Sequence, residues 1–177
     1  AHKLGGPAGV GALWLAAGVG IRQRVRGGGQ ERGVRAGTEN LLGAIGFGAA
    51  ATQAAVRRAA MPAVGVLRDR VVAQLVALGA TVNDDHRPRA HTVAHASWEG
   101  LAAQELVAAL DLEGFSVSAG AACSSGKVEP SESVLRMYPE APWRASGALR
   151  VSLGPDTTGA EVDAFCEALG RVLPRFV

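Results

Sequence analysis

Hydrophobic and polar positions follow different patterns in the two parts of this chain. The first twenty residues combine glycine and proline turn signals with a short apolar run, residues 11–15, which predicts a buried strand. A long stretch rich in Ala and Leu follows and predicts a helix over about 39–60, with Thr38 as its N-terminal cap. Pro62 interrupts this stretch, so a second helix is predicted over 63–78.

Beyond residue 79 short β-like runs alternate with helical ones. The predicted strands are 80–83, 91–98, 115–118 and 149–153, and the predicted helices are 102–110, 131–137 and 159–173. The last helix carries an apolar face at helical spacing, made of Val162, Phe165, Cys166, Leu169 and Leu173. This alternation predicts an α/β or α+β layer domain over 62–177, with a boundary to residues 1–61 near Met61 and Pro62.

Composition excludes several classes of protein. Hydrophobic residues make up 48% of the 177 residues, which is enough to build a core and argues against disorder. The two cysteines cannot frame a disulfide scaffold, and the histidines at 86, 91 and 95 form no metal-ligand group, so no metal site is predicted. A formal charge of +2 is too small to indicate nucleic-acid binding by itself. The uncharged stretches 4–21 and 40–56 predict buried segments rather than membrane spans, because glycine, proline and amide residues interrupt them.

Lys3 is the first residue that could carry chemistry. The chain has only two lysines, Lys3 and Lys127, among its 18 basic residues. Lys3 follows His2 and precedes a Gly-Gly-Pro turn. An amine held at such a place can form an imine with a carbonyl cofactor. The alternative interpretation is a surface lysine at a frayed terminus.

Residues 22–38 form a predicted loop that contains five arginines and three consecutive glycines. Exposed backbone N–H groups and guanidinium groups suit phosphate or carboxylate. Three interpretations are open: an anion-binding loop of an active site, an RNA-binding segment, and a solvated loop without a ligand. No aromatic residue lies between Ile21 and Thr38 to stack on bases, which disfavours RNA.

Cys123 and Arg150 are the remaining candidates. Cys123 lies in a run of small residues, where a thiol is accessible, and Lys127 four positions later favours the thiolate. Cys166, on the apolar face of the last predicted helix, is interpreted as a small core residue. Arg150 lies inside a predicted strand, where a half-buried arginine needs an anionic partner. That partner is either an internal carboxylate or the carboxylate of a substrate.

These segments together resemble the cysteine desulfurases, which are pyridoxal-phosphate enzymes of the class V aminotransferase family with roles in iron–sulfur cluster assembly. Four collinear stretches carry the resemblance: 1–11, 27–40, 118–124 and 149–154. The resemblance extends over essentially the whole chain. It implies the C-terminal portion of the pyridoxal-phosphate-dependent transferase fold of type I. Residues 1–61 would then be the remnant of the cofactor-binding large domain, and residues 62–177 the small α/β domain that carries the cysteine loop.

The resemblance also implies a role for each candidate residue. Lys3 would hold pyridoxal 5'-phosphate through an imine and move protons, with His2 lying against the cofactor. Thr38 would bond the cofactor phosphate of a neighbouring subunit, so the active unit would be a homodimer. Arg150 would bind the carboxylate of L-cysteine, and Cys123 would attack its sulfur, leaving L-alanine and a persulfide.

Further implications concern partners and location. The persulfide on Cys123 would pass to a sulfur acceptor or an iron–sulfur scaffold protein, and Cys123 could serve as a transient cluster ligand. The protein would be cytoplasmic, with no nucleic-acid or membrane partner.

The chain departs from the family pattern in one respect. In the family, the cofactor lysine lies near the middle of a longer chain, and the groups that stack on the cofactor ring and pair with its nitrogen lie upstream. We therefore expect these 177 residues to be a C-terminal fragment that is inactive alone. The alternatives are another class V aminotransferase or lyase, and an inactive fragment that acts only as a binding module.

Overall fold

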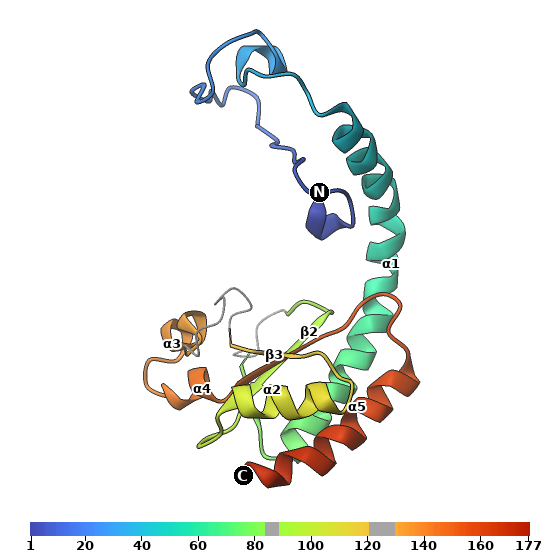
Figure 1. Ribbon diagram of the computed structural model, residues 1–177, viewed down its shortest axis with the longest axis vertical. Helices are drawn as coiled ribbons and strands as arrows, with labels where there is room; N and C mark the ends of the chain where they lie inside the picture. The colour runs from blue at the N-terminus through green and yellow to red at the C-terminus, as the bar shows by residue number, and fades with distance from the viewer. Residues whose placement is uncertain (84–88, 121–129) are drawn as a thin grey trace. The chain divides into compact units, whose positions relative to one another are not determined.

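The computed structural model describes residues 1–83, 89–120 and 130–177, which divide into two compact units, Ala1–Ala59 and Ala60–Val177 (Figure 1). The division falls inside the longest helix, α1 (Leu41–Ala77), close to the boundary expected near Met61 and Pro62. The roles given above to the two domains stay predictions. None of the helices in the described part of the chain is long and apolar enough to cross a membrane.

Helix α1 is continuous, so the prediction of two helices separated at Pro62 is wrong. A proline inside a helix removes one backbone hydrogen bond and crowds the preceding turn, which usually breaks or kinks the helix. Here the preceding turns are rich in alanine, the best helix former. The following turns are fixed by burial of Val64, Val71 and Leu75 in the core. Both effects favour continuation through Pro62.

Asn40, rather than Thr38, caps the start of α1. The Asn40 side-chain oxygen accepts a hydrogen bond from the backbone N–H of Gly43 at 2.9 Å, and the Asn40 carbonyl accepts from Ala44 at 2.8 Å. Asparagine and threonine are both good N-cap residues, so the sequence alone did not choose between them.

The first unit holds two single turns of 3₁₀-helix, η1 (His2–Leu4) and η2 (Glu31–Gly33), besides the start of α1. The strand predicted over 11–15 is absent, and these residues form no regular secondary structure. Leu13 and Trp14 are 73% and 83% exposed. A strand needs a neighbouring strand to satisfy its backbone N–H and C=O groups, and the described residues of this unit provide none.

The second unit is built on a four-stranded antiparallel sheet in the order β1-β2-β4-β3. The strands are β1 (Thr81–Val82), β2 (Val93–Ser97), β3 (Ser118–Ala119) and β4 (Ala148–Ser152). The helices are α2 (Ala103–Leu112), α3 (Glu132–Met137), α4 (Trp143–Ser146) and α5 (Gly159–Val172), followed by the turn η3 (Leu173–Arg175). The predicted alternation of strands and helices is confirmed, except that β3 overlaps its predicted range only at Ser118 and that α4 was not predicted.

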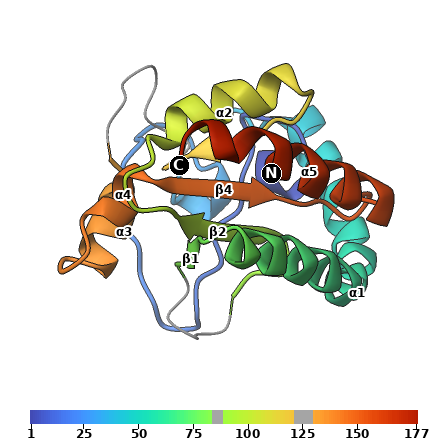
Figure 2. The same cartoon turned by 90° about the horizontal axis from the view of Figure 1, so that it is seen from below.

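One face of the sheet packs on helices. Ala94 and Ala96 of β2 and Leu149 and Val151 of β4 are buried on this face. They share one core with the second half of α1, α2 and α5 (Figure 2). Side chains alternate between the two faces of a strand, so the residues between them lie on the opposite face. That opposite face carries His95 and Ser97 of β2 and Arg150 of β4.

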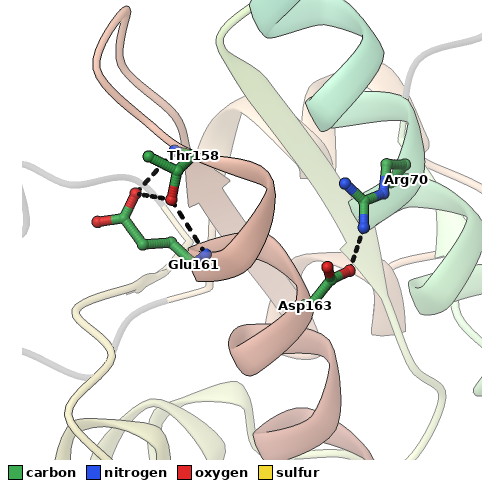
Figure 3. Close-up of polar contacts among 4 residues, drawn as sticks. All are labelled: Arg70, Thr158, Glu161 and Asp163. Carbon is green, nitrogen blue, oxygen red and sulfur yellow. Dashed lines mark hydrogen bonds and ion pairs between the residues drawn. The ribbon is translucent and has the colours of Figure 1, made fainter.

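Helix α5 begins at a capping box. The Thr158 hydroxyl accepts from the Glu161 backbone N–H at 3.2 Å, while the Glu161 carboxylate accepts from the Thr158 N–H at 2.7 Å (Figure 3). The hydrogen bonds that the Thr158 N–H and the Thr158 hydroxyl donate to the carboxylate lower the pKa of the Glu161 carboxyl. Two residues after Glu161, Asp163 pairs with Arg70 of α1 at the surface (Figure 3).

Candidate functional site

Lys3 lies in η1, a turn that packs on the first half of α1. Both His2 and Lys3 are exposed, and no described residue pairs with the Lys3 amine. The turn ends at Gly5, whose φ of +86° is a left-handed conformation that favours glycine. The Arg57 guanidinium of α1 donates a hydrogen bond to the Leu4 carbonyl. The contact with Arg57 therefore holds the turn against α1, while the Lys3 side chain stays exposed.

The small residues of α1 allow this turn to approach the helix. A side-chain carbon added at Gly46 would lie 2.8 Å from the Pro7 ring. Ala50, one turn further along α1, is buried, and its methyl group lies 3.3 Å from the position of a Cβ at Gly6. The prediction that the uncharged stretches 4–21 and 40–56 are buried is wrong, because most of their residues are exposed in the structure. Their glycine and alanine instead allow a close contact between the lysine turn and α1.

The arginine- and glycine-rich loop borders a cavity of about 370 Å³ in the first unit. The lining includes Arg35 and Gly37 of the loop, Asn40, and Phe47 of α1, together with backbone of the turn at Gly9–Gly11. Thr38 is exposed and does not line this cavity, although both of its neighbours do. No hydrogen bond among the described residues joins Thr38 to the lysine turn, and the role expected for Thr38, toward the cofactor phosphate of a neighbouring subunit, stays a prediction.

Arg150 lies on the polar face of the sheet in the second unit. Its partner across the β2–β4 ladder is His95, and its partner across the β3–β4 ladder is Ser118. The Arg150 Nη2 donates a hydrogen bond to the Ser118 hydroxyl at 3.2 Å. The Arg150 Nε is buried and has no hydrogen-bond partner among the described residues.

No carboxylate among the described residues forms an ion pair with Arg150. Of the two partners expected for this arginine, the internal carboxylate is therefore not found in the described part of the chain. A buried guanidinium nitrogen without an acceptor is costly, because its lost hydration is not replaced. An arginine in this state can receive an anion that the described residues do not supply.

Cys123 and Lys127 lie outside the described residues. Residues on the two sides of this segment are hydrogen-bonded to β4 and to α4. The Gly120 N–H donates to the Ala148 carbonyl at 3.0 Å, and the Ser131 N–H donates to the Ala145 carbonyl at 3.1 Å. Ser118, the hydrogen-bond partner of Arg150, precedes Cys123 by five positions in the sequence.

Sequence reasoning missed His95, which lies opposite Arg150 on the neighbouring strand, and Asn83, which contacts His95. The Asn83 side-chain nitrogen lies 3.2 Å from the His95 Nδ1 and 2.6 Å from the Ser97 hydroxyl. Burial, and secondly the positive charge of Arg150, lower the pKa of the His95 imidazole below its ordinary value of 6.5. The alternation of His95 with Ala94 and Ala96 was a visible signal of a polar strand face. The register of β2 and β4, which aligns His95 with Arg150, was not visible in the sequence.

Cys166 has the structural role predicted for it. It is half-buried on α5 and packs against the core. Burial is the main cause that raises the pKa of its thiol, and Asp163 adds to the shift while Arg70 opposes it. A raised pKa leaves less of the reactive thiolate at neutral pH, so Cys166 is a poor nucleophile.

A solved structure of a NifS-like protein has the same fold. It superposes with a TM-score of 0.84 at 31% sequence identity, covering 99% of this chain and 45% of that chain. A NifS-like protein from Rickettsia africae superposes with a TM-score of 0.71 at 24% identity, covering 88% of this chain and 41% of that one. The predicted fold, part of the type I fold of pyridoxal-phosphate-dependent transferases, is confirmed.

Curated proteins named cysteine desulfurase match along the whole chain. That of Bradyrhizobium diazoefficiens is 41% identical over 177 residues, which are 99% of this chain and 45% of the relative. Cysteine desulfurase NifS of Azotobacter vinelandii is 39% identical over 166 residues, which are 92% of this chain and 41% of the relative. The chain thus spans less than half the length of these relatives.

The family model described as aminotransferase class-V matches residues 1–165, which include the lysine turn, the arginine- and glycine-rich loop and the strand of Arg150. With this match over most of its length, the chain belongs to the class-V aminotransferase family, as its four collinear motifs predicted.

Proposed function

We propose that this chain provides the sulfur-accepting half of a cysteine desulfurase, which converts L-cysteine into L-alanine and leaves a persulfide on Cys123. The observation that carries the proposal is Arg150, whose buried Nε has no acceptor among the described residues and which pairs with no described carboxylate. An amino-acid substrate brings the carboxylate that this guanidinium lacks. The names of the relatives supply the substrate class, cysteine.

The residues of the first unit fit the cofactor on which the class-V family in general depends, pyridoxal phosphate. Lys3 offers an exposed primary amine, the group that joins an aldehyde. The loop before α1 offers an exposed hydroxyl at Thr38 and a backbone bend at Gly37, whose φ is +107°, both suited to phosphate. When bound, the cofactor supplies an electron sink for the charge left by bond cleavage. His2 and Lys3 would hold it, and Thr38 would bond the phosphate in a neighbouring subunit of a homodimer.

The residues of this chain then have separate tasks. Arg150 binds the substrate carboxylate and orients the amino acid. Lys3 accepts and returns a proton at its Nζ. The Cys123 thiolate attacks the sulfur of the substrate, so that an S–S bond forms as the C–S bond breaks. The electron pair of the broken bond stays on carbon, which takes up a proton to become the methyl group of alanine, while Cys123 is oxidised to the persulfide.

The persulfide needs an acceptor outside this chain. A sulfur-acceptor or iron–sulfur scaffold protein would take the terminal sulfur, and Cys123 could ligate a cluster transiently during transfer. The cytoplasm, where thiols stay reduced, suits a protein that works through a free thiolate.

A chimaera tests the proposal, because the chain matches less than half of its relatives. These 177 residues replace the matching segment of the Bradyrhizobium cysteine desulfurase. We expect the chimaera, loaded with pyridoxal phosphate, to release alanine from L-cysteine and to carry a persulfide that mass spectrometry locates on Cys123. The 177-residue chain alone is expected to release no alanine.

The pairs of lysines and cysteines in the chain supply matched controls. Cys123→Ser should abolish persulfide formation, while Cys166→Ser should leave it unchanged. Lys3→Ala should abolish cofactor absorbance, while Lys127→Ala should keep that absorbance. Alanine release that survives Cys123→Ser would show that the protein is another class V lyase or aminotransferase, and not a desulfurase.

A further inference from the structure

A row of four polar side chains crosses the sheet of the second unit from one edge to the other. Asn83 follows β1 and donates its backbone N–H to the His95 carbonyl at 2.9 Å. His95 of β2 stands opposite Arg150 of β4, which stands opposite Ser118 of β3. Residues directly opposite each other on antiparallel strands have Cβ atoms about 5 Å apart and point to the same face. His95 and Ser118 therefore flank Arg150 on its two sides.

The hydrogen bonds around Asn83 determine the orientation of its amide. The single hydrogen of the Ser97 hydroxyl is donated to the Arg144 carbonyl at 2.7 Å, so the Ser97 oxygen accepts from the Asn83 Nδ2 at 2.6 Å. The Arg144 guanidinium, which can only donate, lies 3.4 Å from the Asn83 Oδ1. Both contacts place the NH₂ group of Asn83 toward His95.

This orientation in turn determines the tautomer of His95. An amide NH₂ group only donates, so the His95 Nδ1, 3.2 Å away, accepts from it. In a neutral imidazole the proton is then on Nε2. A protonated ring would set an N–H against the N–H of Asn83. Among the described residues no acceptor takes the proton on Nε2.

We propose that His95 is a second carboxylate-binding residue beside Arg150, which donates a hydrogen bond from its Nε2–H to the carboxylate of the amino-acid ligand. This inference rests on the proposed function, in which Arg150 binds that carboxylate. A neutral donor adds a hydrogen bond without repelling the neighbouring guanidinium, which a lysine in this place would do. Two donors on adjacent strands define the orientation of a carboxylate better than one.

Propionate, a carboxylate without an amine or thiol, is the probe. It is titrated into the full chain labelled with ¹⁵N, and the resonances of Arg150 Nε and His95 Nε2 are followed by NMR. We expect both resonances to shift with one dissociation constant, and the His95 nitrogens to show the Nε2–H tautomer. His95→Phe, which keeps a ring but no donor, should weaken binding about tenfold, because a hydrogen bond to a charged group is lost.

Three further variants separate the role of a donor from a role in packing. His95→Gln restores an N–H donor and should recover most of the affinity. In Asn83→Asp the new carboxylate accepts a hydrogen bond from the His95 Nδ1–H, which moves the imidazole proton from Nε2 to Nδ1. This variant should therefore bind propionate more weakly, although both His95 and Arg150 are intact. His91→Phe, at an exposed histidine of the same segment, should leave the affinity unchanged.

The outcomes distinguish this inference from the proposed function. Unchanged propionate affinity in His95→Phe, with binding lost in Arg150→Gln, would overturn the role of His95 and leave that of Arg150 intact. Equal loss in His95→Phe and His95→Gln would show that the ring acts through packing, and would also overturn it. If the unaltered chain does not bind propionate, or if Arg150→Gln binds it normally, the assignment of Arg150 and the inference built on it both fail.

Discussion

The two units of this chain differ in what they bury. The second unit has a large main core, in which Leu106, Leu149 and Leu169 are fully buried, and a small second cluster. In the first unit, two alanines, Ala36 and Ala50, are the only buried hydrophobic residues among those that the structure describes. Most of its large apolar side chains are exposed, among them Trp14 at 83% and Leu42 at 82%.

Hydrophobic residues therefore have different structural consequences in the two units. In the second unit, hydrophobic residues specify a fold because the partners they need are within the chain. In the first unit, residues of the same types form a surface that the described residues of that unit do not cover. The chemistry is divided in the same way, because Lys3 lies in the first unit and Arg150 in the second. Four predictions test and refine this contrast.

The largest expected effect compares two leucine truncations. Leu149→Ala removes a side chain that is 0% exposed and should lower the free energy of unfolding by about 2–5 kcal/mol, because a cavity replaces packed methyl groups. Leu42→Ala, at a leucine 82% exposed, should change it by less than about 0.5 kcal/mol. Urea denaturation of the full chain measures both. Equal losses would contradict the contrast between the units.

The second prediction concerns pH. Because the pKa of folded His95 is below its ordinary value of 6.5, the unfolded chain binds more protons there than the folded chain. The stability contributed by neutral His95 is complete above pH 6.5 and is lost as the pH falls toward the folded-state pKa. We expect the difference in unfolding free energy between wild type and His95→Gln to change across this window, with a slope of at most about one proton. His2→Gln, at an exposed histidine of the first unit, is the control.

The third prediction compares two helix caps. Thr158→Ala removes half of the capping box of α5 and should cost about 1 kcal/mol of unfolding free energy. Asn40→Ala removes the cap of α1 in the first unit. We expect it to speed hydrogen exchange in the first turn of α1 and to leave the global denaturation midpoint unchanged. A shift of that midpoint by Asn40→Ala would show that the first unit unfolds together with the second.

The smallest expected effect is at the Arg70–Asp163 ion pair, whose side chains are 44% and 61% exposed. A double-mutant cycle with Arg70→Gln and Asp163→Asn should give a coupling energy of less than about 1 kcal/mol, because water screens the pair. The coupling should fall further in concentrated salt. A coupling that persists in salt would indicate that this contact between α1 and α5 is better shielded than its exposure suggests.

Most helices and strands of the second unit could be predicted from the sequence, because the patterns that specify them are local. The apolar spacing of α5 and the short runs of β2 and β4 are local patterns, and the core they form confirms them. The same reasoning was wrong at residues 11–15, where an apolar run has no partner strand, and at Pro62, where burial of the following turns overrides the usual effect of proline.

Local patterns also did not reveal one close contact in the second unit. Gly147 lies against β2, and a Cβ there would be 2.0 Å from the Trp98 carbonyl oxygen. The Gly147 carbonyl accepts from the Trp98 N–H at 3.3 Å. Any side chain at this position would separate α4 from the sheet. Nothing in the neighbouring sequence distinguishes this glycine from those in the turns.

Motif order and residue type, which are properties of the chain itself, were sufficient to identify the family and to single out Lys3, Thr38, Cys123 and Arg150. Only the tertiary structure showed that Arg150 has no described carboxylate partner and that Asn83 and His95 stand in its row. The reason is that strand register depends on contacts between residues far apart in sequence, and a shift of one residue would turn His95 to the other face.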